Sequence, residues 1–141
     1  MAPHMSTLLV VDDDAAIRAM YSRSLASLGK VDQADGGRAA IQLLDVRRYE
    51  AIILDLHMPG VDGFAVLETL AKEGHVNRDT PVFVVTGDTS EQVRVRALKV
   101  RSLFLMTKPV PLQMLKSIVE NSILKNAAKV GSDPPRVSKK I

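Results

Sequence analysis

The chain of 141 residues contains no cysteine and no tryptophan, and it has only two tyrosines and three phenylalanines. The absence of cysteine excludes disulfide scaffolds, thiolate zinc sites and cysteine nucleophiles. No apolar run approaches the roughly 20 residues that a membrane-spanning helix needs. The N-terminus also lacks the charged and then apolar pattern of a signal peptide. We therefore expect a cytoplasmic protein without membrane contact.

The sequence also has little charge of one sign, with a formal net charge of +3. Residues 126–141 account for this excess, because the rest of the chain balances. Their charged residues are Lys129, Arg136, Lys139 and Lys140 against Asp133. Charge therefore does not support a DNA-binding face. We expect 126–141 to be a disordered basic tail, 6–125 to form one domain, and 1–5 to be a flexible, partly vector-derived N-terminus.

Short apolar runs indicate the strands of a buried sheet. Four strong runs and one weaker run are residues 8–11, 51–54, 82–85, 103–106 and 30–34. Continuous apolar character is typical of parallel strands that helices cover on both faces. Amphipathic segments of helix length separate the strands, at residues 15–28, 37–47, 62–73, 90–100 and 111–125. This alternation predicts an α/β fold with a doubly wound parallel sheet.

A polar residue follows each of the four strong strands, and ligands of doubly wound sheets bind at that edge. These residues are Asp12, Asp13, Asp55, Thr86 and Lys108. Each alone could be only a helix N-cap or a loop residue, but their convergence indicates a site. Three neighbouring carboxylates repel one another and require a cation, and an all-oxygen site favours Mg²⁺ over Zn²⁺. A lysine and a threonine beside them suit a phosphoryl group, which one aspartate could accept as a nucleophile.

Four stretches, in this order and spacing, resemble the receiver domain of two-component response regulators. They are residues 8–14 (LLVVDDD), 55–63 (DLHMPGVDG), 84–87 (VVTG) and 107–109 (TKP). The resemblance covers about residues 6–125. It implies a flavodoxin-like, CheY-like fold with five strands in the order 2-1-3-4-5 and five helices.

The resemblance also implies the roles of the site residues. Asp55 would accept phosphate from a histidine kinase or a histidine phosphotransfer protein. Asp13 would bind Mg²⁺ directly and Asp12 through water, with further metal contacts from Asp55 and from the backbone carbonyl of His57. Thr86 and Lys108 would contact the phosphoryl group, and the bond from Lys108 to Pro109 would be cis.

The output that the resemblance implies is a change of surface. Thr86 would move toward the phosphoryl group and reshape the face formed by the fourth helix, the fifth strand and the fifth helix, which would bind a downstream protein. We expect a stand-alone switch, a monomer or weak dimer, that loses its phosphate by hydrolysis and is not a turnover enzyme.

One departure from the family concerns the residue that would move together with Thr86. Leu105 stands where the family has Tyr or Phe, three residues before Lys108. The adjacent Phe104 is not expected to substitute, because neighbouring strand residues point to opposite faces. Two interpretations remain open: Leu105 moves as an aliphatic plug, or the signal passes through the fourth helix alone.

Other polar residues near the motifs have two interpretations each. His57 and Asp88, two residues after Asp55 and Thr86, stand at positions that tune hydrolysis in the family, but they could be only exposed loop residues. The basic stretch of Arg94, Arg96, Lys99 and Arg101 is interpreted as a solvated face, with a docking surface for an acidic partner as the alternative. His75, in a polar stretch, is expected to be exposed and without a role.

A competing function is a haloacid-dehalogenase-type phosphatase, because Asp12 and Asp14 form a D-x-D pattern after a strand. Such enzymes usually need a cap and a later acidic pair, whereas the later strands here end in Thr86 and Lys108. A receiver-like fold that has lost phosphorylation is disfavoured, because every acceptor-site residue is present.

Overall fold

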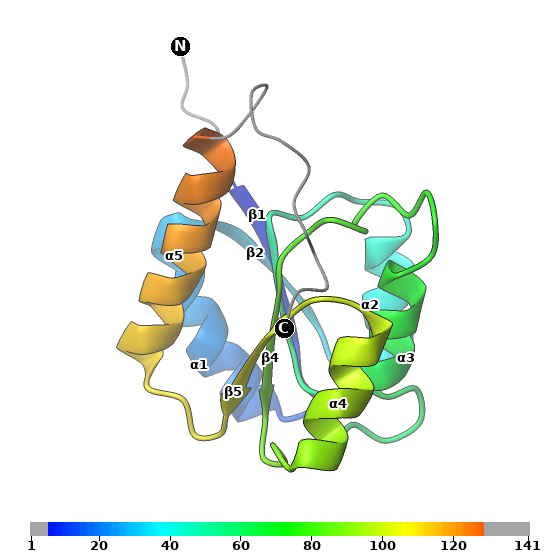
Figure 1. Cartoon of the computed structure of the whole chain (residues 1–141). Coiled ribbons are helices and arrows are strands. Elements are labelled where there is room, and N and C mark those ends of the chain that lie inside the picture. The colour runs from blue at the N-terminus through cyan, green and yellow to red at the C-terminus, as the bar shows by residue number, and fades with distance from the viewer. Residues whose placement is uncertain (1–5, 129–141) are drawn as a thin grey trace.

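The computed structural model describes residues 6–128 and has three layers (Figure 1). A central parallel sheet lies between α1 and α5 on one side and α2, α3 and α4 on the other. Its strands are β1 (Ser6–Val11), β2 (Gly29–Ala34), β3 (Ala51–Leu54), β4 (Val82–Thr86) and β5 (Phe104–Thr107). They are hydrogen-bonded in the order β2-β1-β3-β4-β5. The prediction of a doubly wound sheet in the order 2-1-3-4-5 is confirmed.

The continuous apolar character of the strands follows from burial on both faces. Alternate residues of β1 enter different cores: Leu8 and Val10 face α1 and α5, whereas Leu9 and Val11 face α2 and α3. All four are nearly inaccessible to solvent. Burial of a leucine or valine side chain stabilises a fold by about 1.5–3 kcal/mol, so both cores stabilise the fold.

The helices are α1 (Ala15–Leu25), α2 (Gly37–Leu44), α3 (Gly63–Leu70), α4 (Glu91–Val100) and α5 (Leu112–Ala128), with a short 3-10 helix at Ala26–Leu28. α2 and α3 each end three residues before the predicted boundary. The end of α2 is fixed by Asn77, whose side-chain amide donates hydrogen bonds to the carbonyl oxygens of Leu44 at 2.9 Å and Arg47 at 2.7 Å. The chain after α3 turns at Gly74, which has a φ of 82°, a backbone conformation that glycine adopts without strain.

α5 begins one residue later and ends three residues later than predicted, so it includes residues 126–128. Ala127 and Ala128 extend it because alanine has the highest helix propensity. The predicted tail therefore cannot begin at residue 126. Residues 129–141 and 1–5 lie outside the described part of the chain, so the structure does not test the predictions made for them.

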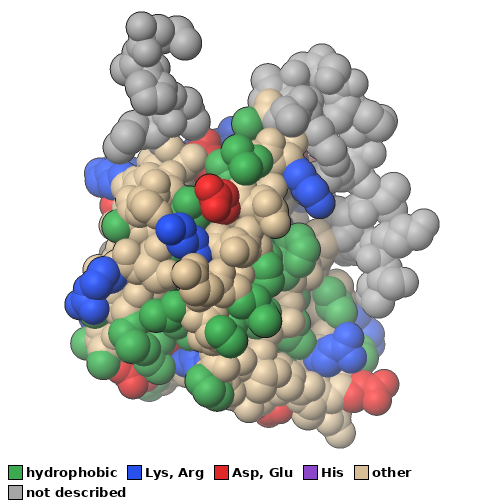
Figure 2. All heavy atoms as spheres, turned by 90° about the vertical axis from the view of Figure 1, so that its left-hand side faces the viewer, with side chains coloured by type: hydrophobic (Ala, Val, Ile, Leu, Met, Phe, Trp, Pro, Cys, Tyr) green, Lys and Arg blue, Asp and Glu red, His purple; other side chains and the backbone are tan. Residues whose placement is uncertain are grey.

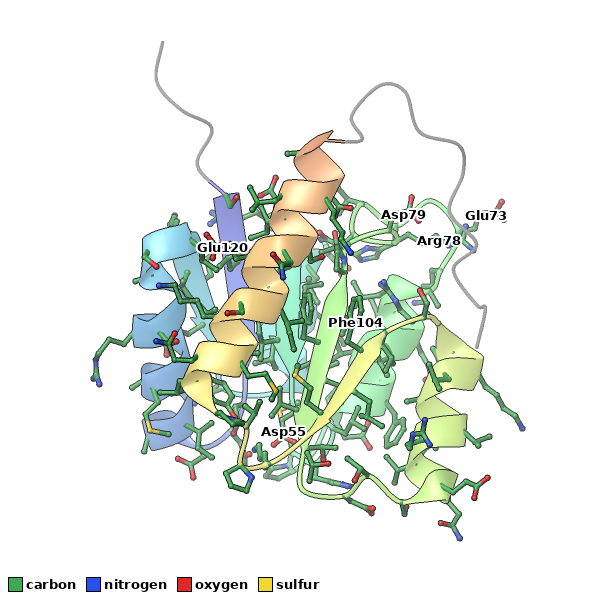
Figure 3. All side chains as sticks on the ribbon, turned by 60° about the vertical axis from the view of Figure 1, so that its left-hand side comes forward. Asp55, Glu73, Arg78, Asp79, Phe104 and Glu120 are labelled. Carbon is green, nitrogen blue, oxygen red and sulfur yellow. The ribbon has the colours of Figure 1, made fainter. Side chains whose placement is uncertain are left out.

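A polar network joins the amino ends of the central strands, and the sequence patterns did not reveal it. The side-chain carbonyl of Asn77 accepts hydrogen bonds from the backbone N–H of Tyr49 at 2.8 Å and from the hydroxyl of Thr80 at 3.0 Å. Arg101, only 7% exposed, donates to the carbonyl oxygen of Thr80 at 2.6 Å. Figure 3 shows Arg78 and Asp79, which lie between Asn77 and Thr80 in the sequence, at the opposite end of the sheet from Asp55.

The structure contradicts one prediction about charged residues and part of another. The side chain of His75 is only 9% exposed; its Nε2 lies 3.0 Å from Asp45 Oδ1, and its Nδ1 accepts a hydrogen bond from the backbone N–H of Asn77. The prediction of a solvated basic face holds for Arg94, Arg96 and Lys99, which are exposed, but not for Arg101, which is buried just after α4. The guanidinium of the exposed Arg96 also lies 3.7 Å from the centre of the Phe64 ring. Arg101 is therefore held by backbone carbonyl groups, and Arg96 packs on an aromatic ring.

The surface formed by α1 and α5 has a mixed character. Figure 2 shows hydrophobic and basic side chains interspersed on this side of the molecule. Exposed apolar side chains on these two helices include Met20, Leu112 and Met114. Within the described residues, no helix is both long and apolar enough to span a membrane.

Candidate functional site

The pairing of the two central strands brings two aspartates together. Val11 of β1 is in register with Leu54 of β3, so the residues that follow them, Asp12 and Asp55, leave the sheet side by side. The backbone N–H of Asp55 donates a hydrogen bond to the carbonyl oxygen of Val11 at 3.0 Å. Asp12 is 2% exposed and Asp55 is 5% exposed. Two acidic side chains are therefore buried at the same edge of the sheet.

Lys108 connects these two carboxylates. Its Nζ atom donates hydrogen bonds to Asp12 Oδ2 at 2.8 Å and to Asp55 Oδ2 at 3.2 Å. The backbone N–H of Lys108 donates to the carbonyl oxygen of Thr86 at 2.8 Å, which joins the ends of β4 and β5. The peptide bond from Lys108 to Pro109 is cis, as expected.

A third carboxylate completes an acidic cluster. One oxygen from each of Asp12, Asp13 and Asp55 lies within 4.8 Å of the others, and Asp13 is the exposed member. These three side chains and Lys108 leave a formal excess of two negative charges when all are ionised. Hard divalent cations such as Mg²⁺ prefer oxygen ligands of this kind. The donor set therefore fits the predicted ion.

The environment changes the protonation of two of these groups. Burial raises the pKa of the Asp55 carboxyl, and the nearby Lys108 charge and the backbone N–H of His57 oppose this increase only in part. Burial lowers the pKa of Lys108, but its hydrogen bonds and charge interactions with Asp12 and Asp55 outweigh that effect, so the pKa is raised. The ammonium form of Lys108 is therefore favoured beside the two carboxylates.

The start of α3 lies directly against Asp55 because Gly63 has no side chain. A Cβ atom at Gly63 would lie 2.4 Å from the carbonyl oxygen of Asp55, so no other residue fits without a shift of the backbone. Asp62 caps α3 by accepting a hydrogen bond from the backbone N–H of Ala65 at 3.0 Å. The loop from β3 to α3 is thereby held close to the acidic cluster.

Thr86, His57 and Asp88 lie on the loops around the site. Thr86 is completely buried at the end of β4, and its hydroxyl accepts a hydrogen bond from the backbone N–H of Asp88 at 3.5 Å. The side chains of His57 and Asp88 are 55% and 48% exposed, and His57 Nε2 lies 3.8 Å from Asp88 Oδ2. Hydrogen bonds from Ser90 lower the pKa of Asp88, which is therefore anionic at neutral pH. The structure thus brings the two predicted tuning residues together.

Leu105 and Phe104 occupy opposite sides of β5. Leu105 packs against the core that contains α2 and α3. The Phe104 ring stacks on Phe83, with a centroid distance of 4.9 Å and an interplanar angle of 9°. Phe83 belongs to the core on the α1 and α5 side, and Figure 3 shows Phe104 on β5. Phe104 therefore does not take the place of an aromatic residue at position 105.

Two features near the site were not found by sequence reasoning. The guanidinium of Arg18 on α1 donates to the carbonyl oxygen of Asp12 at 2.8 Å. The hydroxyls of Thr89 and Thr107 lie 3.1 Å apart and link the loop after β4 to the end of β5. The sequence gives only a weak signal for the contact between Arg18 and Asp12, because the contact depends on how the chain turns at the start of α1.

The third aspartate of the DDD sequence has a structural role. Asp14 is the N-cap of α1, and its Oδ1 accepts hydrogen bonds from the backbone N–H groups of Ala16 at 2.9 Å and Ile17 at 3.2 Å. A capping carboxylate satisfies amides that have no partner within the helix. The phosphatase alternative, which assigned a catalytic role to Asp14 together with Asp12, finds no support.

Comparison with known proteins gives a consistent family. Residues 8–120 match the model of the response regulator receiver domain. Response regulator MprA from Mycobacterium sp. (strain KMS) is 33% identical over 132 residues, which are 93% of this chain and 56% of that protein. MprA from Mycolicibacterium vanbaalenii is 38% identical over 109 residues, 77% of this chain and 46% of that protein. The chain thus spans about half the length of these relatives.

Solved structures have the same fold. Chemotaxis protein CheY4 from Vibrio cholerae superposes with a TM-score of 0.77 at 27% identity, covering 84% of this chain and 99% of that one. A CheY-like receiver domain protein from Methanospirillum hungatei has a TM-score of 0.82 at 20% identity, covering 89% and 99%. With an acidic cluster at the carboxyl end of its sheet and a family match over most of its length, the chain belongs to the response regulator receiver domain family.

Proposed function

We propose that Asp55 accepts a phosphoryl group and that the chain acts as the receiver of a two-component phosphorelay. The observation that carries this proposal is the environment of Asp55, a buried carboxylate that shares Lys108 with Asp12. A carboxylate oxygen of Asp55 attacks phosphorus, a bond from phosphorus to that oxygen forms, and the bond to the leaving group breaks. From a phosphohistidine the leaving group is the imidazole nitrogen, and from acetyl phosphate it is acetate.

The residues proposed to hold Mg²⁺ are Asp12, Asp13, Asp55 and the backbone carbonyl of His57. The support for the three aspartates is that one carboxylate oxygen from each lies within 4.8 Å of the others, and the carbonyl of His57 is proposed from the family resemblance. When bound, the ion supplies positive charge that offsets the repulsion between the phosphoryl oxygens and the aspartates. A receiver domain of a Pseudomonas aeruginosa sensor histidine kinase is described with magnesium in its active-site cleft; at 22% identity and a TM-score of 0.75, this neighbour shares the fold.

Lys108 and Thr86 are proposed to contact the phosphoryl group. The ammonium of Lys108, already directed at Asp55, offsets negative charge on the phosphoryl oxygens. The hydroxyl of Thr86 donates a hydrogen bond to one of those oxygens and draws the loop after β4 inward. His57 and Asp88, whose side chains lie 3.8 Å apart, orient or exclude the water that hydrolyses the acyl phosphate. The domain therefore receives phosphate and loses it without turning over a separate substrate.

Receiver domains interact with histidine kinases and with downstream effectors. We propose that the partner upstream is a histidine kinase or a histidine phosphotransfer protein, and that the downstream target binds the face of α4, β5 and α5. Neither DNA nor a membrane is a proposed partner, the proposed location is the cytoplasm, and the domain is a monomer or weak dimer. Thr86 transmits its movement to Leu105 as an aliphatic plug or to α4 alone.

The test is the intact mass of the protein after incubation with Mg²⁺ and acetyl phosphate. We expect one adduct of about 80 Da, the mass added by phosphorylation, which disappears in Asp55→Asn. Asp35→Asn is a matched control, because Asp35 is an exposed aspartate that also follows a strand, β2. A wild-type protein that gains no adduct and shows no spectral change with a beryllium fluoride phosphate mimic would overturn the proposal.

A further inference from the structure

Arg18 holds the backbone at the centre of the acidic site. It lies on α1, and its Nη1 donates a hydrogen bond to the carbonyl oxygen of Asp12 at 2.8 Å. Its Nε donates to the side-chain oxygen of Gln33 on β2 at 3.3 Å, which anchors the guanidinium from a second element. Arg18 therefore reaches the carbonyl of the first site aspartate without contacting a carboxylate of the cluster.

Every hydrogen-bonding group of Asp12 has a partner. Its N–H donates to the carbonyl oxygen of Ala34 at 3.2 Å. Its Oδ1 accepts from the backbone N–H of Asp14 at 2.9 Å, and its Oδ2 accepts from Lys108 at 2.8 Å. The remaining acceptor is the carbonyl oxygen, which Arg18 binds. Removal of the guanidinium would release this oxygen, which lies in the peptide plane that joins Asp12 to Asp13.

That peptide plane determines where Asp13 lies. The carbonyl group of Asp12 and the nitrogen and Cα of Asp13 lie in one plane, so a hydrogen bond to the carbonyl restrains rotation of the whole unit. The Asp13 carboxylate is the exposed member of the cluster, and no hydrogen bond or ion pair holds it within the described residues. Its position relative to Asp12 and Asp55 therefore depends on the backbone to which it is attached.

We propose that Arg18 is a positioning residue that orients the peptide from Asp12 to Asp13, so that the Asp13 carboxylate is placed to bind a divalent cation with Asp12 and Asp55. This inference rests on the proposed function, in which that cluster holds Mg²⁺.

Charge alone predicts the opposite effect, which makes the inference testable. A guanidinium near the cluster repels a divalent cation, so removal of its charge would strengthen Mg²⁺ binding if Arg18 acted only through its charge. If Arg18 positions Asp13, its removal weakens Mg²⁺ binding. Removal of a residue that orients a metal ligand typically costs about tenfold or more in metal affinity.

The experiment is a calorimetric titration of the metal-free protein with Mg²⁺, comparing wild type, Arg18→Gln and Arg23→Gln. Arg23 is an exposed arginine on the same helix, so its variant has the same change of charge and side chain. We expect about tenfold weaker binding in Arg18→Gln and binding within about twofold of wild type in Arg23→Gln. Arg18→Lys should show a smaller loss, because it keeps a positively charged donor nitrogen. Thermal unfolding in EDTA confirms that each variant is folded at the titration temperature.

If Arg18→Gln binds Mg²⁺ as tightly as wild type or more tightly, the inference is overturned. The proposed function would still stand in that case, provided that the wild-type protein forms the phosphoryl adduct. If Arg18→Gln does not fold, Arg18→Lys takes its place, and binding equal to wild type in that variant overturns the inference as well. A wild-type protein that binds no Mg²⁺ and forms no adduct would instead remove the proposed function, and the inference with it.

Discussion

The ammonium nitrogen of Lys108 lies 3.2 Å from Oδ2 of Asp55, so the proposed phosphoryl acceptor has a cationic partner before any phosphoryl group arrives. The same nitrogen lies closer to Asp12, at 2.8 Å. Lys108 therefore neutralises part of the acidic cluster from the side of β5, while the exposed Asp13 leaves it accessible from the solvent side. The charge of Lys108 therefore opposes the binding of a cation to the cluster, whereas the charge of Asp13 favours it.

We expect Lys108→Met to bind Mg²⁺ more tightly than wild type, by about tenfold, because a charge that repels the cation is removed next to the cluster. Mg²⁺ will also raise the unfolding temperature of this variant more than that of wild type, since a ligand that binds only the native state stabilises it. Calorimetric titration and thermal unfolding measure the two effects. Lys99→Met, an exposed lysine on α4, serves as the control, and unchanged Mg²⁺ affinity in Lys108→Met would count against the electrostatic argument.

The raised pKa of Asp55 predicts how its replacement changes stability with pH. In EDTA, the folded protein binds more protons than the unfolded chain between the ordinary pKa of 3.8 and the higher folded pKa, so the contribution of Asp55 to stability falls as the pH rises through that window. Asp55→Asn has no carboxyl group to ionise at this position, so it is expected to gain stability relative to wild type as the pH rises through the same window. Urea unfolding at a series of pH values measures the difference; a difference that narrows with increasing pH would contradict the prediction.

Asn77→Asp is expected to destabilise the protein by about 3 kcal/mol or more, because a carboxylate would replace the amide that donates to the carbonyl oxygens of Leu44 and Arg47. Water cannot replace the lost donor, since Asn77 is completely inaccessible to solvent. Urea unfolding at pH 7 measures the loss. Asn121→Asp, on the exposed side of α5, is the matched control, and equal losses in the two variants would refute the assigned role of Asn77.

Arg101→Met is expected to cost about 2–4 kcal/mol of stability, since it removes the guanidinium that satisfies the buried carbonyl of Thr80. Arg94→Met makes the same change at an exposed position of α4 and should alter stability by less than about 0.5 kcal/mol. Chemical denaturation of both variants and wild type gives the comparison. The role assigned to Arg101 fails if its variant unfolds at the same denaturant concentration as the Arg94 variant.

The order of the strands and the location of the site were predictable because they depend on short patterns and on a repeated topology. Apolar runs become strands buried on both faces, and the polar residue after each run reaches the same edge. Asp12, Asp55 and Lys108 could therefore be placed together before their contacts were known. The recognisable family motifs added the cis bond at Pro109 and the order of the five strands.

The parts that sequence reasoning missed depend on partners far away in the chain. Arg101 is one basic residue in a basic stretch, and its burial follows from the carbonyl of Thr80, which lies 21 positions earlier. His75 is likewise held by Asp45, 30 positions earlier. Local composition does not contain this information, because a polar side chain that is buried and paired has the same spacing as one that is solvated.

The reach of Lys108 also has a consequence for synthesis of the chain. Its contacts with Asp12 and Asp55 span 96 and 53 positions of the sequence, and the ribosome adds it after both aspartates. Until β5 docks on β4, the two carboxylates lack the ammonium group that partners them in the finished domain. The electrostatic environment of the acceptor is therefore complete only when the last strand is in place, so a partly synthesised chain does not offer the acceptor site of the finished receiver domain.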